Sequence, residues 1–130
     1  MILGIGVDSI EVNRFRKWQY FSHKQLLRIF SQEEIEYCLS HIDKSAERFA
    51  VRFAAREAFF KAFTAAFPDH TFFFLTVCRV LHIAKKNNCP YLVVNWKELS
   101  IAPSSHIRVH ISLTHSDLMA TAFVIIEQYQ

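Results

Sequence analysis

Glycine and proline are scarce in this sequence: Gly4 and Gly6 are the only glycines among 130 residues, and there are only three prolines. Between positions 49 and 63 neither residue occurs, so a helix can run there without interruption. The sequence also lacks internal repeats, low-complexity tracts and linkers that would mark a domain boundary. We therefore expect a single domain over residues 1–130.

Cysteine is sparse as well. Cys38, Cys78 and Cys89 are an odd number of thiols without C-x-x-C spacing, a pattern that gives no sign of a disulfide framework or a metal cluster. We expect reduced thiols in a cytoplasmic protein.

Long hydrophobic runs are missing. The N-terminus, Met-Ile-Leu-Gly-Ile-Gly-Val-Asp, lacks a charged leading segment and reaches an acid at position 8. The other apolar segments are too short to span a bilayer. We expect neither a signal peptide nor a membrane partner.

Charge of one sign does not dominate: 15 basic residues face 12 acidic ones, for a net charge of +3. A nucleic-acid footprint over the whole surface is therefore not expected. The 13 phenylalanines would suit a single-strand nucleic-acid binder, but most have the periodic spacing of core residues. A hydrophobic content of 52% indicates instead that some apolar surface faces a partner subunit.

The segment Phe49–Phe63 carries the longest regular pattern. Apolar and charged residues alternate at spacings of three and four, which predicts a long helix that ends before Pro68. Alanine recurs at every fourth position and predicts a smooth ridge that another element can approach closely. The ridge consists of Ala50, Ala54, Ala58, Ala62 and Ala66, and a basic row consists of Arg48, Arg52 and Arg56.

A further row on this helix begins with Phe49 and Phe53 and continues with Glu57 and Lys61. Charges that follow a buried stripe need a partner or a metal if they are buried too. On the helix alone, an ordinary Glu57–Lys61 ion pair facing solvent is the simpler explanation.

Residues 2–10 predict a strand, because apolar residues alternate with Gly4, Gly6 and Asp8. The two glycines and the carboxylate then share one face, which permits close approach of a ligand or of another backbone. Asp8 either faces this open space or caps a helix that starts near residues 9–11. The local sequence leaves both open.

The other elements fall into a helical half and a β-rich half. Helices are expected over residues 11–19 and 23–30, and from the capping box at Ser31 to Leu39. Strands are expected at 72–75, 77–83, 91–96, 107–114 and 118–126, with a short helix at 96–100. Asn88 takes the place of a turn glycine before Pro90, and Ser116-Asp117 forms a tight turn. The last strand is apolar on both faces, which indicates a central position or a subunit interface.

Two further features have a plain structural explanation when taken alone. Arg14, Arg16 and Lys17 form either a solvated face or a docking surface for an acidic partner. His115 continues the apolar face of the 107–114 strand, as an ordinary core histidine would.

Three segments together point to a family. Gly4-Ile5-Gly6-Val7-Asp8, then Arg52-Phe53-Ala54-Ala55-Arg56-Glu57-Ala58 with Lys61-Ala62, then Ser112-Leu113-Thr114-His115 resemble the three motifs of holo-acyl-carrier-protein synthases. The match keeps their order and spacing over nearly the whole chain.

The resemblance implies an α+β fold, the 4′-phosphopantetheinyl transferase fold, in which an antiparallel sheet packs against a long central helix. Such enzymes are typically homotrimers with active sites between subunits. They transfer the 4′-phosphopantetheine of coenzyme A to a serine of apo acyl carrier protein and release adenosine 3′,5′-bisphosphate, a step that supports fatty acid biosynthesis.

The resemblance also implies roles for particular residues. Asp8 and Glu57 match Mg²⁺ ligands, which would neutralise the pyrophosphate during transfer. Lys61 matches a residue that contacts the phosphates or removes the serine proton, and we favour the phosphate role. The catalytic set is Asp8, Glu57, Lys61 and His115; coenzyme A is expected at Lys44, Arg52, Lys61, Asn87 and His115; and the carrier protein is expected at Arg14, assisted by Arg16 and Lys17.

Three positions depart from the family pattern. Arg56 stands where the family usually has lysine, Asn88 replaces the turn glycine, and Thr64-Ala65-Ala66 replaces a glycine-containing stretch that could let backbone approach coenzyme A. The alternative function is therefore a non-catalytic coenzyme A or carrier-protein binding module with the same fold. Retention of the four catalytic residues argues against it.

Overall fold

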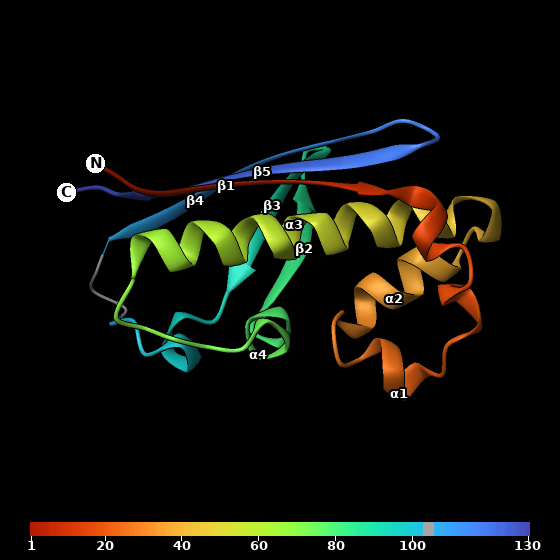
Figure 1. Cartoon of the computed structure of the whole chain (residues 1–130), viewed down its shortest axis with the longest axis horizontal. Helices are drawn as coiled ribbons and strands as arrows, with labels where there is room; N and C mark the ends of the chain where they lie inside the picture. The colour runs from red at the N-terminus through yellow and green to blue at the C-terminus, as the bar shows by residue number, and fades with distance from the viewer. Residues whose placement is uncertain (103–105) are drawn as a thin grey trace.

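The long helix α3 (Ser45–Ala66) is the centre of the computed structural model, which describes residues 1–102 and 106–130. A three-stranded antiparallel sheet lies along one side of α3, and the short helices α1, α2 and α4 lie on the other side (Figure 1). The helix ends before Pro68, as the sequence predicts. The expected α+β architecture is confirmed.

The sheet has the strand order β1-β5-β4, so the central strand is the last one in the chain. Its members are β1 (Ile2–Glu11), β5 (Met119–Gln128) and β4 (Ile107–His115). Asp8 pairs with Ala122, and Ala122 pairs with Leu113 on the far strand. The register therefore places Asp8 on one edge of the sheet and the β4 residues on the other.

The two glycines of β1 face the alanine ridge of α3. A Cβ atom built on Gly4 would overlap the carbonyl oxygen of Ala62, and one built on Gly6 would overlap that of Ala58. The close approach that the strand pattern predicts is therefore that of the helix backbone and not that of a ligand.

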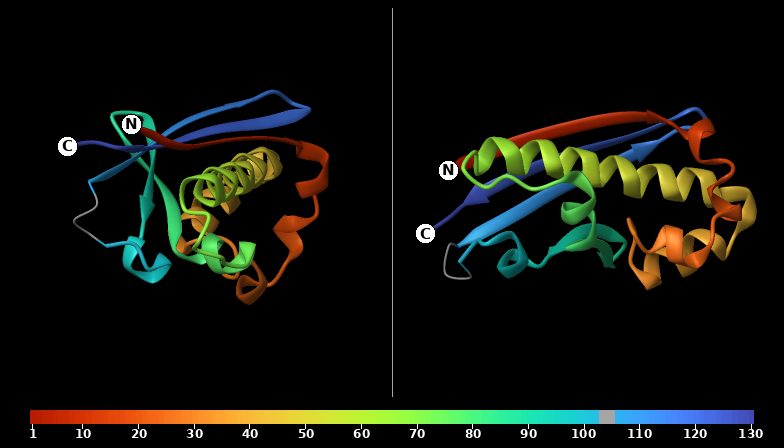
Figure 2. Two further views of the ribbon diagram at one scale, coloured as in Figure 1. Left: turned by 60° about the vertical axis from the view of Figure 1, so that its left-hand side comes forward. Right: turned by 60° about the horizontal axis from the view of Figure 1, so that its bottom comes forward.

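The remaining elements pack around the other sides of α3, and the β2–β3 hairpin reaches the edge strand β4 (Figure 2). They are the 3-10 turns η1 (Val12–Phe15), η2 (Trp18–Tyr20), η3 (Ile42–Lys44) and η4 (Trp96–Leu99), the helices α1 (His23–Leu26), α2 (Gln32–Leu39) and α4 (Phe74–Arg79), and the hairpin of β2 (Leu81–Lys86) and β3 (Cys89–Val94). The predicted capping box is present, because Ser31 Oγ accepts from Glu34 N and the Glu34 carboxylate accepts from Ser31 N.

Four expected elements differ in the structure. The strand expected at 72–75 is wrong, because α4 begins at Phe74, whose ring lies 5.5 Å from that of Phe53 and 5.6 Å from that of Phe60 on α3. Packing of these rings overrides the β propensity of the phenylalanine run. The next strand accordingly starts at Leu81, and the single helices expected over 11–19 and 23–30 are short turns of helix.

The β2–β3 turn shows how the chain manages without glycine. Both central residues adopt the left-handed conformation, with φ of 52° at Asn87 and 63° at Asn88. Two successive positive φ values are typical of the two-residue hairpin turn that matches strand twist, and asparagine tolerates them best among residues with a side chain.

In the described part of the chain, no helix is both long enough and apolar enough to cross a membrane.

Candidate functional site

Asp8, Glu57 and Lys61 meet where β1 passes along α3. Lys61 Nζ donates to the carbonyl oxygen of Val7 at 2.9 Å and lies 3.4 Å from Asp8 Oδ1. The Asp8 side chain is only 17% exposed, whereas that of Lys61 is 53% exposed. The strand and the helix thus bring the two carboxylates and the amine to one half-open cluster, which we call the acidic cluster.

The two carboxylates of the acidic cluster repel each other. Partial burial and the nearby negative charge of Asp8 raise the pKa of Glu57, and the charges of Lys61 and Arg14 counteract part of this rise. A pair of carboxylates held close enough to perturb one another is a common feature of cation sites.

The acidic cluster fits Mg²⁺, although it does not enclose it. Among residues 1–102 and 106–130, no group of three or more histidine, cysteine, aspartate or glutamate side chains could hold a metal ion. Mg²⁺ is commonly bound by only one or two carboxylates, with waters and substrate phosphates as its other ligands. Asp8 and Glu57 would supply this partial set.

A second cluster lines a cavity of about 310 Å³ between α3, the β2–β3 hairpin and the end of β4. Of the residues expected at coenzyme A, this cavity contains Lys44, Arg52 and His115. Asn87 is absent from its lining, and the neighbouring turn residue Asn88 is present instead. We call this the cationic cavity.

The charge balance of the cationic cavity favours an anionic ligand. Lys44, Arg48, Arg52 and Lys85 line it, against a single carboxylate, that of Glu47. His115 is tied to this carboxylate, with Nδ1 lying 3.6 Å from Glu47 Oε2. Arginine and lysine side chains converging on one cavity are the usual means of holding phosphate groups. Tyr37, Glu47, Arg48 and Lys85 could not be predicted as site residues, because α2, β2 and α3 meet only in the folded chain.

Known proteins with this architecture share its sequence pattern. Residues 4–122 match the model of the 4′-phosphopantetheinyl transferase superfamily. The chain belongs to this superfamily. It is 40% identical over 129 residues to the holo-[acyl-carrier-protein] synthase of Treponema denticola, an alignment that covers 98% of this chain and 99% of the relative. It is 37% identical over 132 residues to the synthase of Koribacter versatilis, with 98% and 99% coverage.

Solved structures of such synthases confirm the fold. The holo-(acyl-carrier-protein) synthase of Bacillus anthracis, solved in complex with CoA (3′,5′-ADP), superposes with a TM-score of 0.73 at 28% identity and covers 99% of both chains. The resemblance seen in the three sequence motifs is thereby confirmed over the length of this transferase.

The two clusters of the transferase lie on opposite flanks of α3. Asp8 is on the edge strand β1 and His115 at the end of the other edge strand, with β5 between them. Two strand spacings separate these edges by roughly 9–10 Å. On the helix, Arg52 and Glu57 are five residues apart, so their side chains leave the axis about 140° apart. The acidic cluster and the cationic cavity therefore lie on different flanks of the helix within one chain.

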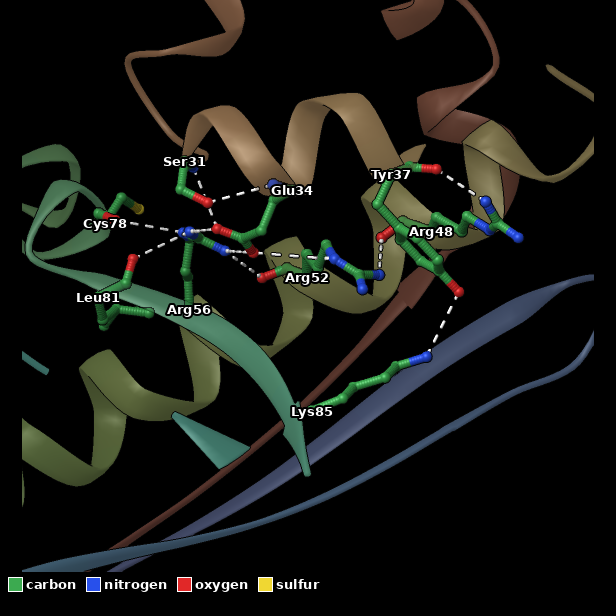
Figure 3. Close-up of polar contacts among 9 residues, drawn as sticks. All are labelled: Ser31, Glu34, Tyr37, Arg48, Arg52, Arg56, Cys78, Leu81 and Lys85. Atoms are coloured by element: carbon green, nitrogen blue, oxygen red, sulfur yellow. Dashed lines mark hydrogen bonds and ion pairs between the residues drawn. The ribbon is translucent and has the colours of Figure 1, made fainter. Parts of the chain in front are cut away.

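Arg56 is not part of either cluster. It is fully buried and donates to both carboxylate oxygens of Glu34, at 2.9 Å from Nη1 and 2.6 Å from Nη2 (Figure 3). It also donates to the carbonyl oxygens of Arg52, Cys78 and Leu81. The three arginines of the basic row on α3 therefore have different roles. Arg56, the last of them, is a structural residue that joins α2, α3 and β2.

The end of α3 is regular helix where the family usually has glycine. Thr64 Oγ1 donates to the carbonyl oxygen of Phe60 at 2.9 Å, and the helix continues to Ala66. The β1 side of this stretch is occupied by Gly4, whose missing Cβ accommodates Ala62.

Of the expected docking residues, Arg14 is near the acidic cluster, since its charge lowers the pKa of Glu57. Arg16 donates from Nε to Asn13 Oδ1 at 2.6 Å and lines a shallow cavity with Leu118 and Met119. Both arginines are exposed at the start of the short helical region.

Proposed function

We propose that this chain transfers 4′-phosphopantetheine from coenzyme A to a serine of apo acyl carrier protein in a Mg²⁺-dependent site that two subunits share. The family and the near-full-length relatives supply the reaction class. The observation that carries the shared site is the position of the two clusters on opposite flanks of α3.

The transfer needs both clusters at once. The serine hydroxyl loses its proton to solvent, its oxygen forms a bond to the phosphorus that carries the pantetheine arm, the phosphoanhydride bond breaks, and adenosine 3′,5′-bisphosphate leaves with the bridging oxygen. Charge neutralisation at the pyrophosphate therefore has to lie next to a pocket for the nucleotide. Within one chain these functions are apart, and a neighbouring subunit that presents its cationic cavity to the acidic cluster brings them together.

Each group in the proposed site has a role that its position supports. Mg²⁺ held by Asp8 and Glu57 would neutralise the pyrophosphate oxygens. Lys61, whose amine already lies at Asp8, contacts a phosphate oxygen. Lys44, Arg52 and His115 of the neighbouring subunit hold the nucleotide, with Asn87 at the rim of the same turn as Asn88.

The outer face of the sheet supports a homotrimer. Side chains on the face away from α3 include Ile5, Val7 and Phe123, which are 53%, 52% and 39% exposed. Val7 and Phe123 are direct cross-strand partners, and Ile5 pairs with Ile125 on the same face. A contiguous exposed apolar patch of this kind marks an interaction surface, and a closed ring of three copies would cover it.

Arg14, with Arg16 and Lys17, is proposed to dock the acidic carrier protein beside the acidic cluster, where the acceptor serine has to arrive. The cellular role that follows is activation of carrier protein for fatty acid biosynthesis. We place it in the cytoplasm, in keeping with the free cysteines Cys38, Cys78 and Cys89.

Subunit complementation tests the shared site. Glu57→Gln disables the acidic cluster, and the double variant Lys44→Gln/His115→Gln disables the cationic cavity; each alone should transfer little phosphopantetheine. After the two proteins are mixed, dissociated and reassociated, about a quarter of the sites in random rings should combine two intact halves. Recovery of activity near that level supports the proposal. If the wild-type protein transfers phosphopantetheine but verified mixed oligomers of the two variants recover no activity, the acidic cluster and the cationic cavity of one site belong to the same chain.

A further inference from the structure

Tyr37 is surrounded by three cations at the edge of the cationic cavity. The guanidinium carbons of Arg48 and Arg52 lie 4.0 Å and 4.6 Å from the centroid of its ring, and Lys85 Nζ lies 5.0 Å from it (Figure 3). All four residues line the cavity. Tyr37 comes from α2, the arginines from α3 and the lysine from β2, so the ring is where three elements meet.

Hydrogen bonds fix this arrangement. Arg48 Nη1 donates to the carbonyl oxygen of Tyr37 at 2.7 Å and to Ser40 Oγ at 3.1 Å. Lys85 Nζ donates to the Tyr37 hydroxyl at 3.4 Å. Partial burial raises the pKa of Tyr37. The contact with Lys85 and the charges of the two arginines together lower this pKa by more than burial raises it, so the net shift is downward. The phenol thus sits in a strongly positive field.

The positive charge around Tyr37 is only partly balanced: Glu47 lines the cationic cavity, and Glu33 and Glu34 line a smaller cavity beside Tyr37, Arg52 and Lys85. Glu34, the nearest carboxylate to Arg52, lies 3.9 Å from Arg52 Nε but is already bound through both oxygens by Arg56. Arg52 Nε is buried without a hydrogen-bond partner. Three mutually repelling cations held around one aromatic ring at the edge of a cavity suit an anion with several oxygens.

We propose that Tyr37 is a positioning residue that holds Arg48, Arg52 and Lys85 for the 3′-phosphate of coenzyme A, and thereby sets the preference for coenzyme A over 3′-dephospho-coenzyme A. The inference rests on the proposed function for the identity of the nucleotide. Among the phosphates of coenzyme A, only the 3′-phosphate is a terminal monoester, with close to two negative charges and three free oxygens. It is the group that three neighbouring cations match best.

The test is calorimetric titration of the full-length protein with coenzyme A and, separately, with 3′-dephospho-coenzyme A. Tyr37→Leu removes the ring and should weaken coenzyme A binding about five- to tenfold while changing 3′-dephospho-coenzyme A binding less than about twofold. Tyr37→Phe restores the ring and should restore most of the preference. A ring that only supported the fold would weaken both ligands alike.

Tyr129→Leu is the matched control. Tyr129 is 39% exposed and has the guanidinium of Arg108 4.6 Å from its ring centroid, but it lies at the chain terminus, outside the cationic cavity. Its replacement should leave the ratio of the two affinities unchanged. If Tyr37→Leu does not fold by circular dichroism, Lys85→Gln, on an exposed strand position, replaces it and should lower the same ratio.

Two outcomes would overturn the inference: a wild-type protein that binds both ligands equally, or a Tyr37→Leu or Lys85→Gln variant that keeps the wild-type ratio, including one that loses affinity for both ligands equally. Because the titration needs no turnover, a wild-type protein that shows the preference but transfers nothing would contradict the proposed function alone.

Discussion

Arg56 and Glu34 form a buried, two-pronged ion pair, with Arg56 Nη2 2.6 Å from Glu34 Oε1 and Nη1 2.9 Å from Oε2. The exposed fractions of the two side chains are 0% and 2%. Arg56 stands where the family usually has lysine. Its remaining donors reach the carbonyl oxygens of Cys78 and Leu81, which a single ammonium group cannot do at the same time as it binds both carboxylate oxygens.

Arg56→Lys should therefore destabilise this chain although it restores the usual family residue. We expect a loss of about 2 kcal/mol in the free energy of unfolding, because charge-assisted hydrogen bonds are lost while the charge is kept. Urea denaturation followed by circular dichroism measures it. Arg28→Lys, at an exposed position, should cost less than about 0.5 kcal/mol; equal costs at both positions would show that the geometry of the buried pair adds nothing.

Gly6→Ala should destabilise the protein by about 3 kcal/mol or more, because the new methyl group overlaps the Ala58 carbonyl oxygen and neither backbone can move freely. Thermal unfolding is the measurement. Ser9→Ala, on the opposite face of the same strand, is the control and loses only a hydrogen bond to Thr121. A Gly6→Ala protein with the wild-type melting temperature would contradict the close packing of β1 on α3.

Glu57→Gln should make the protein more stable at pH 7, by less than about 1 kcal/mol, since the side chain is partly exposed. Partial burial and Asp8 raise the folded-state pKa of Glu57 above its unfolded value. The folded state therefore holds more proton, and wild-type stability falls as pH rises from the unfolded to the folded pKa. The advantage of the variant should vanish below about pH 4, under the unfolded pKa.

Urea midpoints measured at intervals from pH 3.5 to 7.5, a range of about four units, test this pH dependence. Glu36→Gln, which removes one carboxylate from an exposed position on α2, is the control. A Glu57→Gln variant that is less stable than wild type at neutral pH would mean that Lys61 and Arg14 outweigh burial and Asp8.

Phe123→Glu should break the proposed homotrimer. The side chain lies on the outer face of the central strand, opposite Val7, and a charge there cannot be covered by an apolar partner. Analytical ultracentrifugation should show monomer, and phosphopantetheine transfer should fall by at least about a hundredfold, because a shared site needs its neighbour. Leu75→Glu, at an exposed apolar position on α4, should change neither property. A Phe123→Glu protein that is monomeric and fully active would contradict the proposal that two subunits share the active site.

The sequence predicted the periodic elements of the fold well. The alanine ridge, the glycine face of β1, the Ser31 capping box and the central position of β5 all follow from local spacing and are present. The strand expected over Phe72–Leu75 is wrong, because the ring of Phe74 packs on those of Phe53 and Phe60 and no local pattern records that contact.

The acidic cluster could be assembled from motif residues, whereas the cationic cavity could be only half assembled. Tyr37 and Lys85 carry no motif and become neighbours only when α2 and β2 pack on α3. The sequence pattern could not distinguish the role of Arg56 from those of Arg48 and Arg52, because all three lie in one row of the helix. The partner that sets Arg56 apart, Glu34, is 22 residues away in the sequence.

Intact-mass spectrometry of apo acyl carrier protein, incubated with this protein and coenzyme A with and without Mg²⁺, tests the central claim most directly. We predict a mass gain of one phosphopantetheine group that requires the metal and is abolished in Glu57→Gln. No gain with several carrier proteins, from a wild-type protein shown to be folded and to bind coenzyme A, would contradict the claim. It would identify the chain as a binding module, with Thr64-Ala65-Ala66 as the first segment to restore.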